Sequence, residues 1–378
     1  MIDKEAREGE DLRASREARE QRGASCRSWS GEDRGKRYAA GRARKRDAME
    51  ERRIEAVYAS DERFLPVLLA SAESLFTENT ENPVRLHILS DGISERGKEK
   101  LSRLAERFHQ ELCFYPLTEE SFRGDAFHLT KDWPRAAVAR LRIEKILPES
   151  LERVLYLDCD TMVRGDLSPL FSMDMKGMWA GGVCECMDEN YLRSLGLSGC
   201  CCYINSGVIL YELSACRREK LSERLGALME GPAKRYKYPD QDAINVSMQG
   251  HILSLPFRTN LLSQPLAFSF RDYERYRDGR LPYSEREYEE AKKDPLIVHF
   301  AGGFAYARPW YQNCRHPYRE EFLQYYRRNG GEYFGRDNRN KKQRLVALLF
   351  ALPLPFLKLP LLRLLRRRNN RQHGKRRA

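Results

Sequence analysis

The chain has 378 residues, of which 41% are apolar and 32% are charged, and its formal net charge is +12 at pH 7. A chain of this length can bury a large hydrophobic core in one or two domains. The net charge belongs to the C-terminal end, because residues 341–378 contain four Lys, eight Arg and no Asp or Glu. The other 340 residues are electrically balanced, which argues against a catalytic domain built as a nucleic-acid groove and predicts that nucleic acid is not a partner.

The first 52 residues are dominated by Arg, Glu, Lys, Asp, Ser and Gly and contain very few β-branched or aromatic residues. Such a segment buries too little apolar surface to offset its ordering entropy. We therefore predict a disordered, charged tail over residues 1–52, within which Met49 is a second candidate start of the protein.

From residue 54 onward, short apolar segments alternate with amphipathic ones. The predicted elements, alternately strand and helix, are residues 54–60, 64–76, 84–92, 94–108, 111–117 and 136–148. In the second helix, Leu101, Leu104 and Phe108 recur at helical spacing. Strands that alternate with helices of this length indicate a mostly parallel sheet, and ligands of such sheets bind beyond the carboxyl ends of the strands.

The next predicted strand lies in RVLYLDCDTMVRGDL, residues 153–167, and ends at two carboxylates, Asp158 and Asp160. A carboxylate at this position lowers β-propensity and, if buried, costs desolvation energy, so the pair requires a functional reason. Two close carboxylates favour a hard divalent cation. The chain contains neither G-x-x-x-x-G-K-[ST] nor a G-x-G-x-x-G after the first strand. A bridging metal ion is therefore the expected means of holding phosphate.

Three further polar motifs follow downstream. YINSGVILYEL (203–213) places polar residues and a glycine before an apolar strand, YPDQDAIN (238–245) is a polar cluster, and PLIVHFAGG (295–303) ends a strand at a histidine and two glycines. Taken singly, each motif is also explained by a turn, a helix cap or a buried histidine whose hydrogen bonds are satisfied. Their order and spacing favour one functional site.

The series AVYASDERF, AAVARLRIEKILP, VLYLDCDTMVRGDL, INSGV, DQDAIN and HFAGG…RPW, between Ile54 and Tyr326, resembles glycosyltransferase family 8. This family consists of retaining transferases and includes bacterial lipopolysaccharide galactosyl- and glucosyltransferases and, more distantly, glycogenin. The resemblance implies an α/β fold, a single Rossmann-like A-type glycosyltransferase domain with a mostly parallel central sheet, over residues 53–330. It also implies a UDP-sugar donor and Mn2+.

The resemblance also assigns roles to residues of this sequence. The implied metal ligands are Asp158, Asp160 and His299. The residues implied to contact the sugar nucleotide are Ala59, Asp61, Arg140, Asp158, Gly302 and Arg308. The residues implied at the donor sugar and the reacting centre are Asn205, Asp240 and Gln241. A divalent ion at the three ligands would neutralise the charge that develops on a UDP leaving group.

Two positions depart from the family pattern. Arg308 precedes a Pro-Trp pair where the family usually has Lys, and two additional residues separate it from the His-Gly motif. Arginine can still bind phosphate in a bidentate manner. Arg63 stands where the family often has Asn, in the first-strand motif.

Retention of configuration can be explained by two mechanisms, which assign different roles to the residues of the DQD motif (residues 240–242). A double displacement needs a nucleophile beneath the anomeric carbon, and an amide is a poor one. We favour Gln241 as a stabiliser of an oxocarbenium-like state, with the leaving phosphate as the base. Asp240 as the nucleophile is the alternative.

Residues 331–378 are predicted to form a linker and a membrane-associating tail. The segment RLVALLFALPLPFLKLPLLRLLRRR (344–368) is strongly apolar but is interrupted by Lys358 and three prolines, whereas a spanning helix requires about 20 predominantly apolar residues. An interfacial segment with a polybasic end fits this pattern and favours an anionic membrane surface. We therefore expect a cytoplasmic protein associated peripherally with the inner face of the cell membrane. The alternative is a hydrophobic helix that packs on the domain.

The chain has ten cysteines, and its charged N-terminus lacks the apolar segment of an export signal. We therefore expect reduced thiols in a cytosolic protein. Zinc is a weaker interpretation of Cys184, Cys186 and the run of cysteines at 200–202, because adjacent thiols rarely bind one ion and no two C-x2-C pairs are present.

The sequence thus predicts a retaining hexosyltransferase that moves galactose or glucose from a UDP-sugar to a glycan or lipid-linked glycan acceptor with the help of Mn2+. A hydrolytic metal enzyme on the same scaffold would need a residue dedicated to activating water, and none is evident. A non-catalytic sugar-nucleotide-binding or scaffold protein would be expected to have lost metal ligands, whereas all three are present.

Overall fold

The computed structural model describes residues 53–122, 135–199, 202–230, 236–303, 305–351 and 359–364. The predicted N-terminal tail, residues 1–52, lies outside these ranges, as does the strongly basic end after residue 364. None of the helices within the described ranges combines the length and the apolar character needed to span a membrane.

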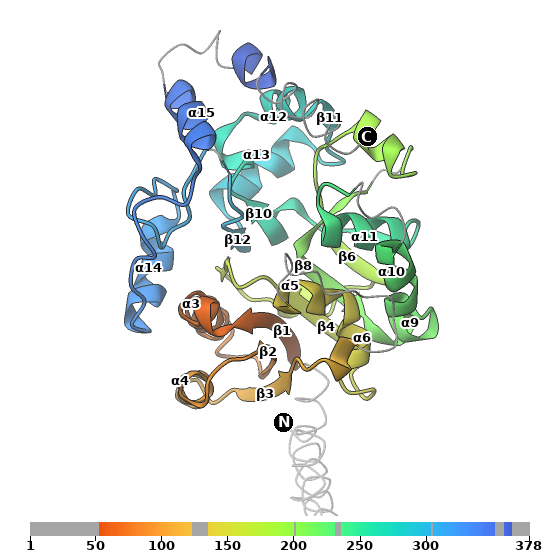
Figure 1. Ribbon diagram of the computed structural model, residues 1–378, viewed down its shortest axis with the longest axis vertical. Coiled ribbons are helices and arrows are strands. Elements are labelled where there is room, and N and C mark those ends of the chain that lie inside the picture. Colours follow the sequence, from red (N-terminus) through yellow and green to blue (C-terminus); the bar gives the residue numbers. More distant parts are fainter. Residues whose placement is uncertain are drawn as a thin grey trace, which may run out of the picture. The chain divides into compact units, whose positions relative to one another are not determined.

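A seven-stranded sheet forms the centre of the fold, in the order β3-β2-β1-β4-β8-β6-β9 (Figure 1). Its strands are β1 (Ile54–Asp61), β2 (Val84–Asp91), β3 (Glu111–Pro116), β4 (Arg153–Leu157), β6 (Ala180–Cys184), β8 (Ile204–Glu212) and β9 (Ile252–Ser254). β1 runs parallel to both β2 and β4, and β2 runs parallel to β3. β8 is antiparallel to both of its neighbours. The prediction of an α/β fold with a mostly parallel central sheet is confirmed, with β8 as the exception.

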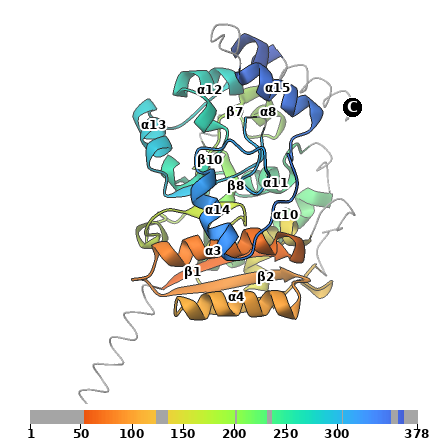
Figure 2. The same cartoon turned by 90° about the vertical axis from the view of Figure 1, so that its left-hand side faces the viewer.

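The first half of the chain supplies the helices that follow the parallel strands. They are η1 (Glu62–Phe64), α3 (Leu65–Glu78), α4 (Glu95–Arg107), η2 (Glu120–Phe122), α5 (Arg135–Ala139), η3 (Arg140–Arg142), α6 (Ile143–Ile146) and α7 (Ser168–Phe171). The connections β1–α3–β2 and β2–α4–β3 run in the same direction along the sheet, so that right-handed crossovers put α3 and α4 on one face. The two helices contact each other beside β1 and β2 (Figure 2).

The helix predicted over residues 136–148 is interrupted in the structure. It consists of two short α-helices, α5 and α6, joined by the 3-10 turn Arg140–Arg142. The apolar spacing that predicted one helix is real, but the arginines at both ends of this turn are also buried. Burial of a guanidinium requires polar partners, and Arg140 has them in Asp158 and the carbonyl of Ser206.

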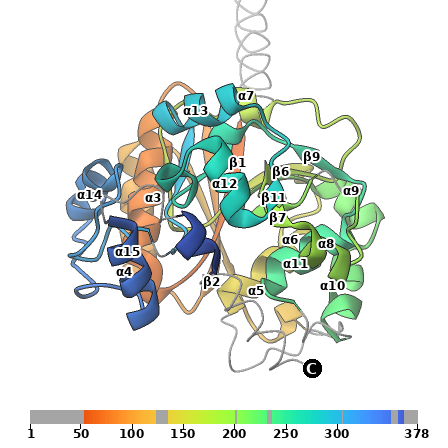
Figure 3. The ribbon, with the colours of Figure 1, turned by 90° about the horizontal axis from the view of Figure 1, so that it is seen from above.

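The remaining elements form two small sheets and further helices. One sheet has the order β10-β12-β5, from β10 (Leu261–Leu262), β12 (Ile297–His299) and β5 (Thr161–Val163), and the other pairs β7 (Met187–Asp188) with β11 (Gly279–Arg280). The helices are α8 (Glu189–Ser194), α9 (Leu213–Arg218), α10 (Leu221–Glu230), α11 (Pro239–Ser247), η5 (Phe257–Asn260), η6 (Pro265–Ala267), α12 (Phe270–Arg277), α13 (Glu285–Lys293), α14 (Arg319–Arg328) and α15 (Lys341–Ala351). The β7–β11 ribbon lies beside α8 and α12 (Figure 3).

In the C-terminal segment, residues 359–364 pack on the fold, and α15 packs through Val346 while other apolar side chains of this helix are exposed. Residues 359–364 are helical, and Leu362 is buried in the hydrophobic core with 3% of its surface exposed. Arg363 makes an ion pair with Asp278 at 2.6 Å. On α15, in contrast, Leu345 and Leu348 are 55% and 68% exposed. The domain boundaries predicted at residues 53 and 330 stay predictions.

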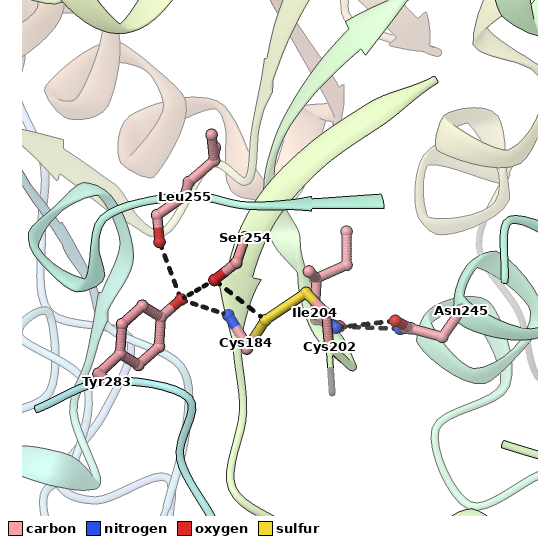
Figure 4. The surroundings of a disulfide bond; sticks show 7 residues. All are labelled: Cys184, Cys202, Ile204, Asn245, Ser254, Leu255 and Tyr283. Carbon is pink, nitrogen blue, oxygen red and sulfur yellow. Dashed lines mark hydrogen bonds between the residues drawn. A yellow bond between two sulfur atoms is a disulfide. The ribbon is translucent and has the colours of Figure 1, made fainter. Parts of the chain in front are cut away.

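Cys184 and Cys202 form a disulfide (Figure 4). The expectation that all cysteines are reduced thiols is therefore wrong for this pair. The sequence could not reveal the pairing, because the two residues meet only when β6 and β8 come together as antiparallel neighbours. Cys200 and Cys201 lie outside the described residues. Among the described cysteines, five are not part of a disulfide: Cys113, Cys159, Cys186, Cys216 and Cys314.

Candidate active site

Three predicted metal ligands meet at the carboxyl end of the central sheet. Asp158 directly follows β4, Asp160 lies in the turn before β5, and His299 is the last residue of β12. The antiparallel pairing of β12 with β5 places His299 opposite Thr161 and so beside the turn. One ligand atom from each of the three side chains lies within 4.8 Å of the others. The predicted ligands are therefore brought together.

The imidazole of His299 is oriented by its neighbours. Its Nε2 lies 3.2 Å from Oδ1 of Asp160 and 3.8 Å from Oδ2 of Asp158. Its Nδ1 lies 3.1 Å from Oδ1 of Asn260, which can only accept a hydrogen bond. The amide group of Asn260 in turn donates to Oδ1 of Asn205 at 2.9 Å. With its hydrogen on Nδ1, His299 presents a lone pair on Nε2 toward the two carboxylates.

Gly207 leaves the space that this imidazole occupies. A Cβ at this position would lie 2.2 Å from Cε1 of His299 and 2.8 Å from Oδ2 of Asp158. The backbone of Gly207 also accepts a hydrogen bond from the N–H of Asp158 at 2.7 Å. Two carboxylates and an imidazole whose Nε2 faces them, in a space that a methyl group would fill, fit a divalent ion that accepts mixed oxygen and nitrogen ligands.

Cationic side chains around the cluster keep the carboxyl group of Asp160 ionised. Burial alone would raise the pKa of Asp160, but Arg308 and His299 hold it well below its usual range. Burial alone would lower the pKa of His299, but Asp160 and Asp158 raise it above its usual value. Asp160 is thus an anion, and His299 binds a proton more tightly than a free histidine would.

Arg140 links the cluster to the DQD motif. Its guanidinium lies 2.7 Å from Oδ1 of Asp158 and 3.5 Å from Oδ2 of Asp240, and it donates to the carbonyl of Ser206 at 3.0 Å. It lies over the ring of Tyr156. Burial would lower the pKa of Arg140, but the carboxylate of Asp158 raises it well above its usual value, so the group stays cationic. The predicted donor-site arginine therefore lies beside the predicted metal ligands.

Arg308 also reaches the cluster, despite the two additional residues before it. Its Nη2 lies 3.0 Å from Oδ2 of Asp160, and its guanidinium lies over the ring of Trp310. Its Nε is buried and has no hydrogen-bond partner among the described residues. Gly302 is close by, since a Cβ on it would lie 3.7 Å from this Nε. An unpartnered, charged donor beside a glycine is suited to an oxygen of an anionic ligand.

Asn205 and Gln241, predicted at the reacting centre, are hydrogen-bonded to each other. Oε1 of Gln241 accepts from Nδ2 of Asn205 at 3.0 Å and from the backbone N–H of Ser206 at 3.2 Å. Oδ2 of Asp240 accepts from the hydroxyl of Ser206 at 3.1 Å. Asn205 belongs to β8 rather than to the segment before it, so the prediction of where this strand begins was wrong. The role of Asn205 at the reacting centre stays a prediction.

Comparison with known proteins identifies the family. The sequence model of glycosyl transferase family 8 matches residues 55–314. The chain belongs to glycosyl transferase family 8. This family 8 glycosyltransferase is 26% identical to general stress protein A of Bacillus subtilis over 278 residues, which cover 72% of this chain and 92% of that protein. It is 26% identical to a lipopolysaccharide 1,2-glucosyltransferase of Escherichia coli, over 70% of this chain and 75% of that one.

A solved structure shows the same fold. The galactosyltransferase LgtC, in complex with donor and acceptor sugar analogs, matches with a TM-score of 0.62 and 23% identity, over 73% of this chain and 96% of that one. The fold inferred from the motifs, an A-type glycosyltransferase domain, is therefore confirmed, and so is the family resemblance. The protein is a glycosyltransferase.

Glu185 is a residue of this glycosyltransferase's site that the sequence prediction missed. Its Oε1 accepts from Nδ2 of Asn205 at 2.9 Å and from Nε2 of Gln241 at 3.2 Å, and its Oε2 pairs with Arg277 at 3.1 Å. Arg277 is itself buried and donates to the carbonyl of Cys186 at 2.7 Å. A usable signal was present, because Glu185 follows the apolar strand AGGVC as Asp158 follows β4.

The transferase has a cavity of about 390 Å³ next to Glu185. Its wall includes apolar side chains from α8 and the β7–β11 ribbon together with charged and hydroxyl-bearing ones. The lining residues include Glu185, Met187, Leu192, Arg193, Tyr203 and Arg280. The β7–β11 ribbon is tightly closed, since a Cβ on Gly279 would lie 2.1 Å from the carbonyl oxygen of Met187.

The two predicted residues of the first strand have structural partners in the transferase. Oδ1 of Asp61 accepts the backbone N–H of Phe64 at 2.9 Å and so caps η1. The carbonyl of Ala59 accepts from the thiol of Cys159, the residue between the two aspartate ligands, at 3.3 Å. Ala59 is therefore adjacent to the cluster through Cys159, and the nucleotide contacts of both residues stay predictions.

Proposed function

We propose that this family 8 glycosyltransferase is a retaining hexosyltransferase that moves galactose or glucose from a UDP-sugar to a glycan or lipid-linked glycan. The observation that carries the proposal is the cluster of Asp158, Asp160 and His299, whose ligand atoms lie within 4.8 Å of one another. Galactose and glucose are favoured because relatives of this chain are named lipopolysaccharide glucosyl- and galactosyltransferases.

Mn2+ is the proposed occupant of the cluster. Carboxylate oxygens and an imidazole nitrogen form a mixed ligand set that Mn2+ tolerates better than Ca2+ does. When bound, Mn2+ would supply Lewis-acid neutralisation of the charge on a leaving diphosphate. Asn260 fixes the tautomer of His299, and Arg140 fixes the carboxylate of Asp158, so both ligands are oriented in advance.

The cationic side chains have complementary tasks in this proposal. Arg308 offers its unpartnered Nε to a diphosphate oxygen, and the backbone of Gly302 leaves room for that oxygen. Arg140 carries a positive charge between the metal cluster and Asp240, where the donor sugar is proposed to lie. Ala59 and Asp61 are proposed to hold the uracil and ribose. Asp160, His299 and Arg140 are all buried, which strengthens their electrostatic interactions with a bound ligand.

Retention of configuration is proposed to depend on Gln241. Its carbonyl oxygen is held by Asn205 and by the backbone of Ser206, so it presents a fixed dipole rather than a nucleophile. This dipole stabilises an oxocarbenium-like state, and the leaving phosphate takes the proton of the incoming hydroxyl. Asp240 as the nucleophile is less favoured, because its carboxylate is held by Arg140 and the hydroxyl of Ser206.

The acceptor is proposed to enter through the cavity beside Glu185. A sugar presents both apolar C–H faces and hydroxyl groups, and the cavity wall offers Leu192 and Met187 together with Arg193 and Tyr203. The cavity adjoins Glu185, whose carboxylate contacts Gln241 directly. A hydroxyl of the acceptor would thus approach the anomeric carbon from this side.

The C-terminal tail is proposed to hold the enzyme at the inner face of an anionic cell membrane. α15 combines Lys341, Lys342 and Arg344 with the exposed Leu345 and Leu348. Each cationic side chain near an anionic surface contributes about 1 kcal/mol of attraction, and the leucines add a hydrophobic contribution. Peripheral attachment would place the protein beside a lipid-linked acceptor.

The test is UDP release from a panel of UDP-sugars with Mn2+, measured with and without a membrane-lipid extract. Wild-type protein is expected to release UDP from UDP-glucose or UDP-galactose, and the extract is expected to increase the rate. Asp160→Ala should abolish release while the circular dichroism spectrum stays unchanged, since one ligand is lost. If no UDP-sugar is cleaved, or if Asp160→Ala turns over at the wild-type rate, the proposal is wrong.

A further inference from the structure

The Cys184–Cys202 disulfide joins two chain segments that lead directly into the proposed active site (Figure 4). It connects the last residue of β6 to a residue two positions before β8, 18 residues further along the chain. Glu185 follows the first cysteine immediately, and Asn205 lies three residues after the second. These two residues are hydrogen-bonded to each other across the bridge at 2.9 Å.

Each end of the bridge is anchored to a different part of the fold. The hydroxyl of Tyr283 accepts hydrogen bonds from the backbone N–H of Cys184 at 2.9 Å and from the hydroxyl of Ser254 at 3.1 Å. On the other side, Ile204 donates to Oδ1 of Asn245 at 2.7 Å and accepts from its Nδ2 at 2.9 Å. The two anchors belong to separate elements, and the bridge adds a covalent connection between them to the backbone pairing of Cys184 with Ile204 (Figure 4).

Backbone pairing is irregular at the bridge. β6 and β8 pair in register from Ala180 to Gly182, but the register shifts between Gly182 and Cys184. A regular ladder would hold the strand ends together without a covalent link, whereas a bulge leaves the bulged strand free to bend. Pairing resumes at Cys184, which lies opposite Ile204, and the backbone N–H of Glu185 donates to the carbonyl of Tyr203 at 2.7 Å. The disulfide therefore adds a covalent link just beyond an irregular point of the ladder.

The bridged segment is also attached to the helix that carries Gln241. From α8, inside the segment, the hydroxyl of Tyr191 donates to Oδ2 of Asp242 at 2.6 Å. Just after the segment, the hydroxyl of Tyr203 donates to Oδ1 of the same carboxylate. Asp242 is fully buried and is the next residue after Gln241 in α11. The bridged segment is thus connected to Gln241 in two ways: Glu185 hydrogen-bonds to Gln241 itself, and two tyrosines hydrogen-bond to the next residue, Asp242.

We propose that Cys184 and Cys202 form a thiol–disulfide control site of this glycosyltransferase. The bridged form keeps Glu185, Asn205 and Gln241 hydrogen-bonded to one another and keeps the wall of the adjacent cavity in place. Opening of the bridge by a dithiol reductant releases α8 and lowers transfer to the acceptor. Binding of the metal and of UDP persists, because the metal ligands lie directly after β4, in the turn before β5 and at the end of β12. The assignment of these roles rests on the proposed function.

The chemistry is an exchange of two electrons and two protons. A thiolate of the reductant attacks Cys202, which is 8% exposed whereas Cys184 is 1% exposed, and Cys184 leaves as a thiolate. The second thiol of the reductant then displaces the mixed disulfide. The reductant ends as a cyclic disulfide, and both cysteines of the protein end as thiols. An oxidised dithiol of the same class reverses the reaction.

The test compares bridged and reduced full-length protein. The protein is treated with dithiothreitol or with its oxidised form, and alkylation followed by peptide mass spectrometry reports the state of Cys184 and Cys202. Hydrogen–deuterium exchange is then measured. Reduction is expected to accelerate exchange about tenfold or more in peptides over residues 185–199 and 239–247 and to leave β4 and β12 unchanged. In parallel, the Kd for UDP with Mn2+ is expected to stay within about twofold.

Matched variants distinguish the effect of losing the bridge from the effect of losing a thiol elsewhere in the protein. The double variant Cys184→Ser/Cys202→Ser is expected to show the fast exchange with or without dithiothreitol. Cys113→Ser, which removes a half-buried thiol of β3 outside any disulfide, is expected to behave like the wild type. If the double variant does not fold, the chemically reduced wild-type protein still provides the comparison.

Three results would overturn the proposal. They are an absence of the bridge in oxidised protein, equal exchange in verified bridged and reduced forms, and acceleration that covers the whole chain equally. Turnover of UDP-sugar is measured in the same samples. If neither form cleaves any UDP-sugar, the proposed function is wrong, while the exchange data still decide whether the bridge controls the segment.

Discussion

Replacement of Gly207 by alanine should disable metal binding although it removes no ligand. The added Cβ would lie 2.2 Å from Cε1 of His299 and 2.8 Å from Oδ2 of Asp158. Carbon atoms in contact are ordinarily about 3.5–4.0 Å apart, so the imidazole or β8 would have to move by about 1.3 Å or more. Sites for metal ions tolerate ligand displacements of only about 0.2 Å.

The expected magnitude follows from this displacement. Loss of the groups that orient a ligand typically lowers metal affinity by about 10- to 100-fold, and Gly207→Ala should reach or exceed that range. Crowding of the buried site should also cost about 1–3 kcal/mol of folding free energy. The variant should therefore fold, with a lowered melting temperature and a much weaker affinity for Mn2+.

Titration of nucleotide-free protein with Mn2+, followed by electron paramagnetic resonance, measures this affinity directly. Gly303→Ala is the matched control, because a Cβ there meets no atom of the described residues within 4 Å, its chain neighbours left aside, and it should bind Mn2+ as the wild type does. Wild-type affinity in folded Gly207→Ala would refute the inference that His299 and Asp158 hold the ion together.

Three other measurements probe separate parts of the molecule. Because Asp160 raises the pKa of His299, a proton competes with the metal for Nε2, so the affinity for Mn2+ should increase as the pH rises from 6 to 8, and a pH-independent affinity would contradict the ligand role. Arg308→Ala should weaken UDP binding about tenfold or more in an isothermal titration, and Arg308→Lys should recover much of the loss; unchanged binding in the alanine variant would place this side chain away from the diphosphate. Leu345→Glu with Leu348→Glu should reduce sedimentation with anionic vesicles and leave UDP release intact, and undiminished sedimentation would remove α15 from the membrane contact.

Much of the fold followed from the sequence because its signals are local. β1 and β2 are apolar runs, and α4 shows helical spacing, so each was predicted to within two residues of its observed bounds. The direction of β8 was not predictable in this way. An apolar strand has the same composition whether its neighbours run parallel or antiparallel to it, and only the sheet decides.

The same distinction between local signals and tertiary contacts applies to the candidate site. Asp158 and Asp160 were found because two carboxylates at the end of an apolar strand are conspicuous in sequence, and His299 followed from the family resemblance. Asn260 was missed, and Gly207 was noted only as a glycine of the INSGV motif, because their roles consist of tertiary contacts, a hydrogen bond to an imidazole and the absence of a methyl group. No pattern of neighbouring residues records such contacts.

The three side chains of the Asp158–Asp160–His299 cluster come from distant parts of the sequence, which determines when the cluster can form during synthesis. Asp158 and His299 are about 140 residues apart in sequence, so a chain still emerging from the ribosome has no complete cluster until β12 has been synthesised and docked against β5. Closing such a long loop is slow, and the ion cannot assist it earlier because its ligands are not yet together. Once the strands have met, an ion at a concentration 100 times its Kd would stabilise the finished fold by about 2.7 kcal/mol. Metal supply would then act on the lifetime of the completed enzyme rather than on the early steps of its folding.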